Sequence, residues 1–211
     1  RYPNLTKLIH EISKLDGLER IRISSIEITE INNEEFLTEL KDNPKLCKHM
    51  HIPVQSACNN TLKMMNRKYT IEEFNEIIKK IRTVKPDINI TTDLIVGFPN
   101  ENDNDFNDTI NTLKQIGFTK IHTFPYSRRK GTVADKMDGH IDGITKKKRV
   151  HEVLKLSNEL ENKFYTSKVG QIYDGVVEVH DNGLVVVHTS NFIPVIINDK
   201  VDNNSIVNVQ I

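Results

Sequence analysis

The feature that most constrains the fold is a regular alternation of β-branched runs and amphipathic helical patterns through roughly the first 165 of the 211 residues. Apolar runs predict four strands, at 21–26, 49–54, 88–96 and 120–124. Periodic stripes predict helices at 5–15, from 32, at 70–85, at 101–116 and at 145–164. Such strand–helix units favour parallel strands with right-handed crossovers. We therefore predict an α/β fold with a parallel (β/α) barrel or partial barrel.

The pattern changes near Gly170. From there to Ile211 the chain shows only short strands and turns, with Asp181-Asn182-Gly183 as a hairpin turn. This spacing predicts a small all-β module of about five strands. The expected organisation is a partial barrel at 1–144, a helical connector at 145–169 and the β-module at 170–211.

Composition excludes several classes of protein. The formal net charge is zero, so contact with nucleic acid must come from local patches. Two cysteines are too few for a disulfide scaffold or an all-thiolate zinc site. No apolar run approaches the ~20 residues that span a bilayer, and no signal-peptide pattern is found. We expect a cytoplasmic protein without membrane contact and, because residue 1 is arginine, a piece of a longer chain.

Polar residues follow each expected strand: Glu27, Gln55, the segment 97–101 and Tyr126. In parallel barrels the functional residues lie at the carboxyl ends of the strands. An acid, an amide, an exposed glycine backbone and an aromatic ring suit a zwitterionic, nucleoside-like ligand. Arg67 could bind a carboxylate there, but its spacing fits a surface arginine equally well.

Four segments, 46–56, 62–70, 91–99 and 124–132, resemble the methylthiotransferase branch of the radical S-adenosylmethionine enzymes. They are closest to the subgroup that acts on threonylcarbamoyladenosine in tRNA. Residues 170–211 resemble the RNA-binding TRAM domain. The resemblance implies a radical SAM partial barrel followed by a small TRAM-like barrel. It also implies tRNA as the partner and addition of a methylthio group at C2 of a modified adenosine beside the anticodon.

The resemblance also assigns residues to the cofactor S-adenosylmethionine. Glu27 matches an acid that contacts it, and Gln55 with Arg67 matches a pair that holds its ribose and carboxylate. The turn from Gly97 through Phe98 to Glu101, and the strand end from Phe124 to Tyr126, match contacts to its adenine. The chain departs from the family at Ala57-Cys58-Asn59 and at Asn100, where glycine is common; both departures could alter backbone approach.

The family's catalytic [4Fe–4S] cluster is held by a Cys-x-x-x-Cys-x-x-Cys loop that this sequence lacks. Cys47 and Cys58 cannot supply the three thiolates. We therefore expect clusters only in a full-length parent, no metal site here, and a chain that is inactive by itself. The catalytic residues stay unassigned.

Several residues have two interpretations. His49, His51 and His122 lie on or beside expected strands, and core or rim histidines are favoured over metal ligands. Asp93 lies in a buried-looking strand and needs a partner, for which Arg22 and His122 are the candidates; structural pairing is favoured over catalysis.

Two basic runs stand out. Arg128, Arg129 and Lys130 follow the last barrel strand, where tRNA phosphate contact and a solvated face are equally compatible. The basic run 146–149 lies at the start of a helix, where positive charges interact unfavourably with the helix dipole. This placement predicts an acidic neighbour or a binding partner. Two rival functions are a non-catalytic RNA-binding module and a barrel lyase with a Schiff-base lysine. For the lyase, Lys120 lies at the wrong end of its strand.

Overall fold

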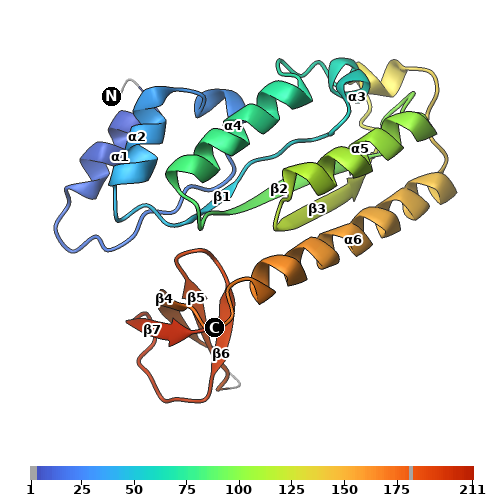
Figure 1. Ribbon diagram of the computed structural model, residues 1–211. Coiled ribbons are helices and arrows are strands. Elements are labelled where there is room, and N and C mark those ends of the chain that lie inside the picture. The colour runs from blue at the N-terminus through green and yellow to red at the C-terminus, as the bar shows by residue number, and fades with distance from the viewer. Residues whose placement is uncertain (1–3, 181–182) are drawn as a thin grey trace.

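The computed structural model describes residues 4–180 and 183–211. The described helices and strands follow the order helix–helix–strand–helix–helix–strand–helix–strand–helix, and then four strands (Figure 1). The α-helices are α1 (Leu5–Ser13), α2 (Glu34–Asp42), α3 (Asn59–Met64), α4 (Ile71–Val84), α5 (Asp103–Ile116) and α6 (Gly143–Thr166). The strands are β1 (His49–His51), β2 (Asn89–Val96), β3 (Lys120–Pro125), β4 (Ile172–Val179), β5 (Val185–Thr189), β6 (Pro194–Ile197) and β7 (Ile206–Gln210).

A three-stranded parallel sheet of order β1-β2-β3 organises the first part of the chain. Helices α4 and α5 lie along one face of it (Figure 1). The alternate residues Ile90, Leu94 and Val96 of β2 are buried in the main core with the apolar stripes of these helices. The parallel strand–helix architecture predicted from the alternating pattern is confirmed.

Local signals in the sequence set the helix limits. Thr70 and Glu73 form a capping box at the start of α4. Asn102 and Asp105 form another at the start of α5, which ends at Gly117 with a φ of 67°. The short helix α3 was missed, because six residues are too few for a helical stripe to stand out.

The predicted strand at 21–26 was wrong. Ile21 makes one bridge with Leu46, and Ile26 donates a hydrogen bond to the carbonyl of His51. The N–H of Ile21 donates to Lys45 and the N–H of Ile26 donates to His51. The segment 45–51 therefore advances six residues while the segment 21–26 advances five, so the two are out of register by one residue. A parallel ladder needs equal advance on both strands, so the segment stays irregular and the sheet has three strands instead of four.

The strand predicted at 49–54 is cut short at His51. Pro53 has no backbone N–H, and the N–H of Val54 donates to the hydroxyl of Thr92 at 2.8 Å instead of to a ladder carbonyl. The ladder resumes once, at the bridge between Gln55 and Leu94. This arrangement holds Gln55 at the carboxyl edge of the sheet.

The β-module is an antiparallel sheet of four strands in the order β6-β5-β4-β7. Its all-β character is confirmed, but five strands and a closed barrel were expected. Within the described residues β6 and β7 lie at the two edges and do not pair. Asp181 and Asn182 of the predicted hairpin turn lie outside the described residues.

The β-module contacts the amino-terminal end of the parallel sheet. Asn89 donates a buried hydrogen bond of 2.8 Å to the carbonyl of Asn191, and the ring of Phe192 lies 4.7 Å from that of His49. The guanidinium of Arg22 lies 4.6 Å from the Phe192 centroid. The module has its own small core around Val177 and Val187.

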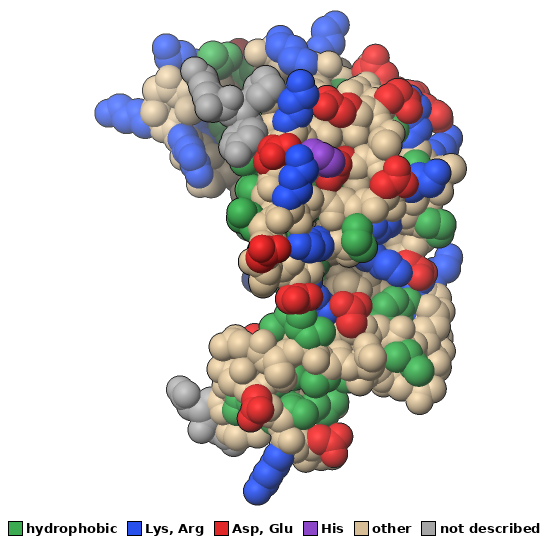
Figure 2. All heavy atoms as spheres, turned by 90° about the vertical axis from the view of Figure 1, so that its left-hand side faces the viewer, with side chains coloured by type: hydrophobic (Ala, Val, Ile, Leu, Met, Phe, Trp, Pro, Cys, Tyr) green, Lys and Arg blue, Asp and Glu red, His purple; other side chains and the backbone are tan. Residues whose placement is uncertain are grey.

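The surface carries charges of both signs. Figure 2 shows Lys and Arg beside Asp and Glu over the larger part of the molecule, and a concave outline between that part and the module. This mixing agrees with the zero net charge. In the described part of the chain, no helix is both long and apolar enough to cross a bilayer.

Candidate functional site

A cavity of about 570 Å³ opens at the carboxyl end of the parallel sheet. Its volume lies within the range of small-molecule sites. The residues that line it come from β2, β3 and the loops that follow the strands: Gln55, Asp93, Ile95, Phe124, Pro125, Tyr126, Ser127, Arg129, Thr132 and Ala134. Of the residues assigned to the cofactor by resemblance, it brings together Gln55, Phe124 and Tyr126.

Gln55 is held in an unusual backbone conformation. Its φ is 61°, in the left-handed region that residues other than glycine rarely adopt. Its N–H donates to the carbonyl of Asp93, and its own carbonyl accepts from the N–H of Ile95, both at 2.9 Å. Such strain costs on the order of 1–3 kcal/mol and concentrates at functional sites.

The turn from Gly97 to Glu101 is held by hydrogen bonds to the buried carboxylate of its last residue, Glu101. Glu101 Oε2 accepts from the N–H of Gly97 at 3.0 Å and from that of Phe98 at 3.4 Å. Arg149 Nη1 donates to Glu101 Oε1 at 2.9 Å. Burial raises the pKa of Glu101, outweighing these hydrogen bonds and the arginine charge, which act in the opposite direction. The acidic neighbour expected for the run 146–149 is therefore Glu101, with Asp103 at 2.8 Å from Arg149 Nη2.

Gly97 has a φ of 72°, and a Cβ there would lie 2.2 Å from Cγ of Lys146. The open side of this glycine is thus filled by a helix α6 side chain. Asn100 also has a positive φ, 66°, and its side chain donates to the carbonyl of Asp138. Asparagine tolerates this conformation, so the turn keeps its shape without a glycine there.

Tyr126 connects the turn to the cavity. Its ring meets the Phe98 ring edge-on, with centroids 5.1 Å apart, and stacks on His140 at 6.1 Å. Its hydroxyl is buried and has no hydrogen-bond partner. A buried hydroxyl without a partner is uncommon and marks a place where a ligand or water can bind.

Glu27 and Arg67 bind each other and do not line the cavity. Arg67 Nη1 lies 3.1 Å from Glu27 Oε1, and both side chains are partly exposed. These two residues, both assigned to the cofactor by resemblance, therefore neutralise each other in this structure.

The three basic residues after β3 differ in their surroundings. Arg128 is bound to Asp135, whose carboxylate lies 3.0 Å from Arg128 Nε. Arg129 lines the cavity, and Lys130 is exposed. The module lies at the other end of the sheet, so this run and the module do not form one continuous patch.

Asp93 has a partner that the sequence interpretation missed. His51 Nε2 lies 3.2 Å from Asp93 Oδ2; neither Arg22 nor His122 makes an ion pair with it. The register places Asp93 opposite His122 and Thr91 opposite His51. The alternation of His49, His51, Thr91 and Asp93 along adjacent runs could have indicated the pairing, had the register been known.

An iron–sulfur cluster does not fit the residues of this chain. Cys47 and Cys58 are both buried, and burial raises the pKa of the Cys58 thiol, against thiolate ligation. Within the described residues no group of three or more His, Cys, Asp or Glu side chains could hold a metal ion. The cavity, by contrast, offers an amide, a carboxylate, an unpaired hydroxyl and aromatic walls, which fit a nucleoside-bearing cofactor.

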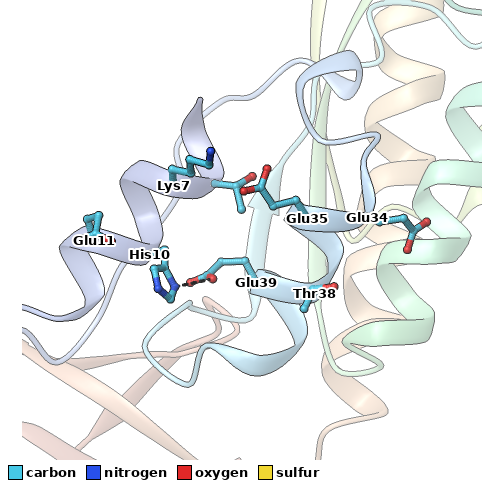
Figure 3. A pocket seen from close by; sticks show the side chains of 8 residues that line it. Lys7, His10, Glu11, Glu34, Glu35, Thr38 and Glu39 are labelled. Atoms are coloured by element: carbon cyan, nitrogen blue, oxygen red, sulfur yellow. Dashed lines mark hydrogen bonds and ion pairs between the residues drawn. The ribbon is translucent and has the colours of Figure 1, made fainter. Parts of the chain in front are cut away.

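A second cavity, of about 620 Å³, lies between α1 and α2 (Figure 3). Two of its charged residues bind each other, since His10 Nδ1 lies 3.2 Å from Glu39 Oε2, and Glu35 accepts a hydrogen bond from Asn4 outside the lining. It lies away from the strand ends, and we assign no ligand to it.

The family model of the radical SAM superfamily matches residues 1–113. The chain belongs to the radical SAM superfamily. The matched region includes β1, β2, Gln55 and the turn at 97–101.

Radical SAM relatives with curated names are similar over most of the chain. The threonylcarbamoyladenosine tRNA methylthiotransferase MtaB of Bacillus subtilis is 37% identical over 92% of this chain and 44% of its own length. A tRNA-2-methylthio-N(6)-dimethylallyladenosine synthase of Thermodesulfovibrio yellowstonii is 43% identical over 84% of this chain and 41% of its own length. The chain thus spans about two fifths of the curated relatives it matches.

The fold is also that of a solved radical SAM enzyme. The coproporphyrinogen III oxidase of Escherichia coli superposes with a TM-score of 0.58 over 74% of this chain and 36% of that one, at 18% identity. This likeness confirms the α/β radical SAM fold and carries no argument about the substrate.

Proposed function

We propose that this chain forms the C-terminal part of a tRNA methylthiotransferase, with residues 1–144 as a partial radical SAM barrel, 145–169 as a connector and 170–211 as a TRAM-like RNA-binding module. The observation that carries the proposal is the cavity at the strand ends, which joins Gln55, Phe124 and Tyr126. The named methylthiotransferases at 37% and 43% identity support it.

In this proposal the cavity binds S-adenosylmethionine. Gln55 donates and accepts at the ribose, while Phe124 and Tyr126 contact the adenine. Glu101 holds the turn at Gly97 and Phe98 in place by accepting hydrogen bonds from their backbone N–H groups. Glu27 and Arg67 would have to separate for Arg67 to reach the cofactor carboxylate. With an electron and a [4Fe–4S] cluster, which the rest of a longer protein would hold, one molecule of the cofactor would supply a 5′-deoxyadenosyl radical, and a second molecule would supply the methyl group.

The proposed substrate is an adenosine of tRNA modified at N6, beside the anticodon, which receives a methylthio group at C2. We favour N6-threonylcarbamoyladenosine, because Arg129 lines the cavity and its guanidinium can bind the threonyl carboxylate. An N6-dimethylallyl group, which has no charge, is the second candidate. The enzyme would act in the cytoplasm.

Binding of S-adenosylmethionine tests the proposal directly. We expect the longer protein to bind it in equilibrium dialysis, and Tyr126→Phe and Gln55→Ala to weaken binding by about 1 kcal/mol each, the value of a neutral hydrogen bond. Thr83→Ala, an exposed change on α4, is the control. Unchanged affinity in both cavity variants would remove the cofactor from this cavity.

A further inference from the structure

The loop between α3 and α4 forms a cavity of about 530 Å³ that shares no lining residue with the strand-end cavity. Helix α3 begins soon after Gln55, so this loop lies at the same carboxyl end of the sheet as the proposed cofactor site (Figure 1). The residues of its lining that matter here are Lys63, Asn66, Arg67, Lys68, Tyr69 and Glu73.

Positive charge exceeds negative charge in this lining, which holds three cations and one acid. The carboxylate of the acid, Glu73, accepts a backbone hydrogen bond in the capping box of α4. Arg67 is bound to Glu27, with 3.1 Å between Nη1 and Oε1. Lys63 and Lys68 are both exposed, and neither forms an ion pair within residues 4–180 and 183–211. Their two ammonium groups are therefore available to an anionic ligand.

Hydrogen bonds hold the loop in one shape. Asn66 has a φ of 57°, a left-handed conformation that asparagine tolerates. Its N–H donates to the carbonyl of Lys63 at 3.0 Å, and Lys68 Nζ donates to its Oδ1 at 2.9 Å. The N–H of Arg67 donates to the carbonyl of Leu62 at 2.9 Å. A loop held in this way loses little conformational entropy when a ligand binds.

The chemistry of the lining favours phosphate over a protein surface. Its aromatic residue, Tyr69, is buried, and the hydroxyl donates to the carbonyl of Val54 at 3.1 Å. Protein interfaces depend on exposed apolar or aromatic anchors, which the lining does not present. Lysine and asparagine side chains, by contrast, are common donors to the phosphates of nucleic acids. Since the net charge of the chain is zero, attraction of RNA depends on such local groups.

We propose that this cavity binds phosphates of the RNA backbone, with Lys63 and Lys68 supplying the charge and the Asn66 amide a hydrogen bond. The inference rests on the proposed function, because the RNA is the one whose adenosine reaches the strand-end cavity. The sheet order is β1-β2-β3, so the loop that follows β1 and the basic run that follows β3 lie on opposite sides of β2. The RNA backbone is then held on both sides of the cofactor cavity.

The test measures how RNA binding depends on salt when the two lysines lose their charge. The longer protein is titrated by fluorescence anisotropy with an anticodon stem-loop RNA that has no terminal phosphate, so only backbone phosphates can bind. Each contact to a single strand contributes about 0.7 to the slope of log K against log salt. We expect Lys63→Ala with Lys68→Ala to flatten the slope by about 1.4. Lys63→Arg with Lys68→Arg keeps both charges and the wild-type slope.

The matched control is Lys80→Ala with Lys114→Ala, which removes two exposed charges from α4 and α5 and should keep the wild-type slope. An unchanged slope in the Lys63 and Lys68 alanine variant, or an equal change in the control, would overturn the inference. Either result leaves the proposed function standing when the wild type binds both the RNA and S-adenosylmethionine, the latter measured by equilibrium dialysis. If the wild type bound neither, the proposed function would fail and the inference with it.

Discussion

Arg149 of α6 donates to Glu101 at 2.9 Å in a pair whose side chains are 5% and 4% exposed. The pair joins the last helix of the α/β part to the turn after β2. Removing one partner of a buried ion pair leaves a buried charge, which typically costs 3–5 kcal/mol.

We therefore expect Arg149→Met to lower the free energy of unfolding by about 3–5 kcal/mol, measured by urea denaturation. Asp103→Asn removes only the exposed partner of the same arginine and should change it by less than about 1 kcal/mol. Equal losses in the two variants would show that the buried pair is not the source.

His49 should make stability fall in mild acid. Burial, assisted by the charge of Arg22, lowers its pKa to about 4. The unfolded chain takes up a proton near pH 6.5 and the folded one only near pH 4, so stability is lost as pH falls between these values. The loss at this site approaches about 3 kcal/mol. His49→Gln should lose less over the same range. The exposed His151→Gln should follow the wild type, and if His49→Gln did so as well, His49 would not be the group responsible.

Binding of tRNA should depend on salt through Arg129 and Lys130 more than through Arg128. Arg128 is already bound to Asp135. Each phosphate contact contributes about 0.7–0.9 to the slope of log K against log salt. We expect Arg129→Ala with Lys130→Ala to flatten the slope by about 1.4–1.8 in filter binding. Arg128→Ala alone should barely change it. No change in the double variant would identify this run as a solvated face.

Arg67→Ala in the longer enzyme should weaken S-adenosylmethionine binding by about 1.5–3 kcal/mol, as measured by calorimetry. This requires Arg67 to leave Glu27 when the cofactor binds. The neighbouring Lys68→Ala is the control and should bind normally. If Arg67→Ala bound as tightly as wild type, the pair with Glu27 would be only a surface ion pair.

Periodicity predicted the main helices and β2 well, because each presents one apolar face to a common core. It failed at 21–26, where Ile21, Ile23 and Ile26 look like a strand but a one-residue slip against the partner prevents a ladder. Strand pairing depends on the register between two distant segments, and the sequence of one segment alone does not specify that register.

The candidate site was predicted unevenly for a similar reason. Residues after strand ends could be named from the sequence, and Gln55 and Tyr126 do meet in one cavity. The pairing of Glu101 with Arg149 joins residues 48 positions apart, and that of Asp93 with His51 depends on strand order. Such partners become visible only in three dimensions.

The length of helix α6 sets the distance between the cavity rim and the β-module. The helix begins near Gly97 and Tyr126 at the carboxyl end of the sheet and leads to the module at the amino end (Figure 1). Its 24 residues measure about 36 Å at 1.5 Å each, on the order of ten stacked nucleotides. An RNA that touches both the cavity rim and the module must therefore be long enough to cover that span, so a short oligonucleotide would engage only one of them at a time.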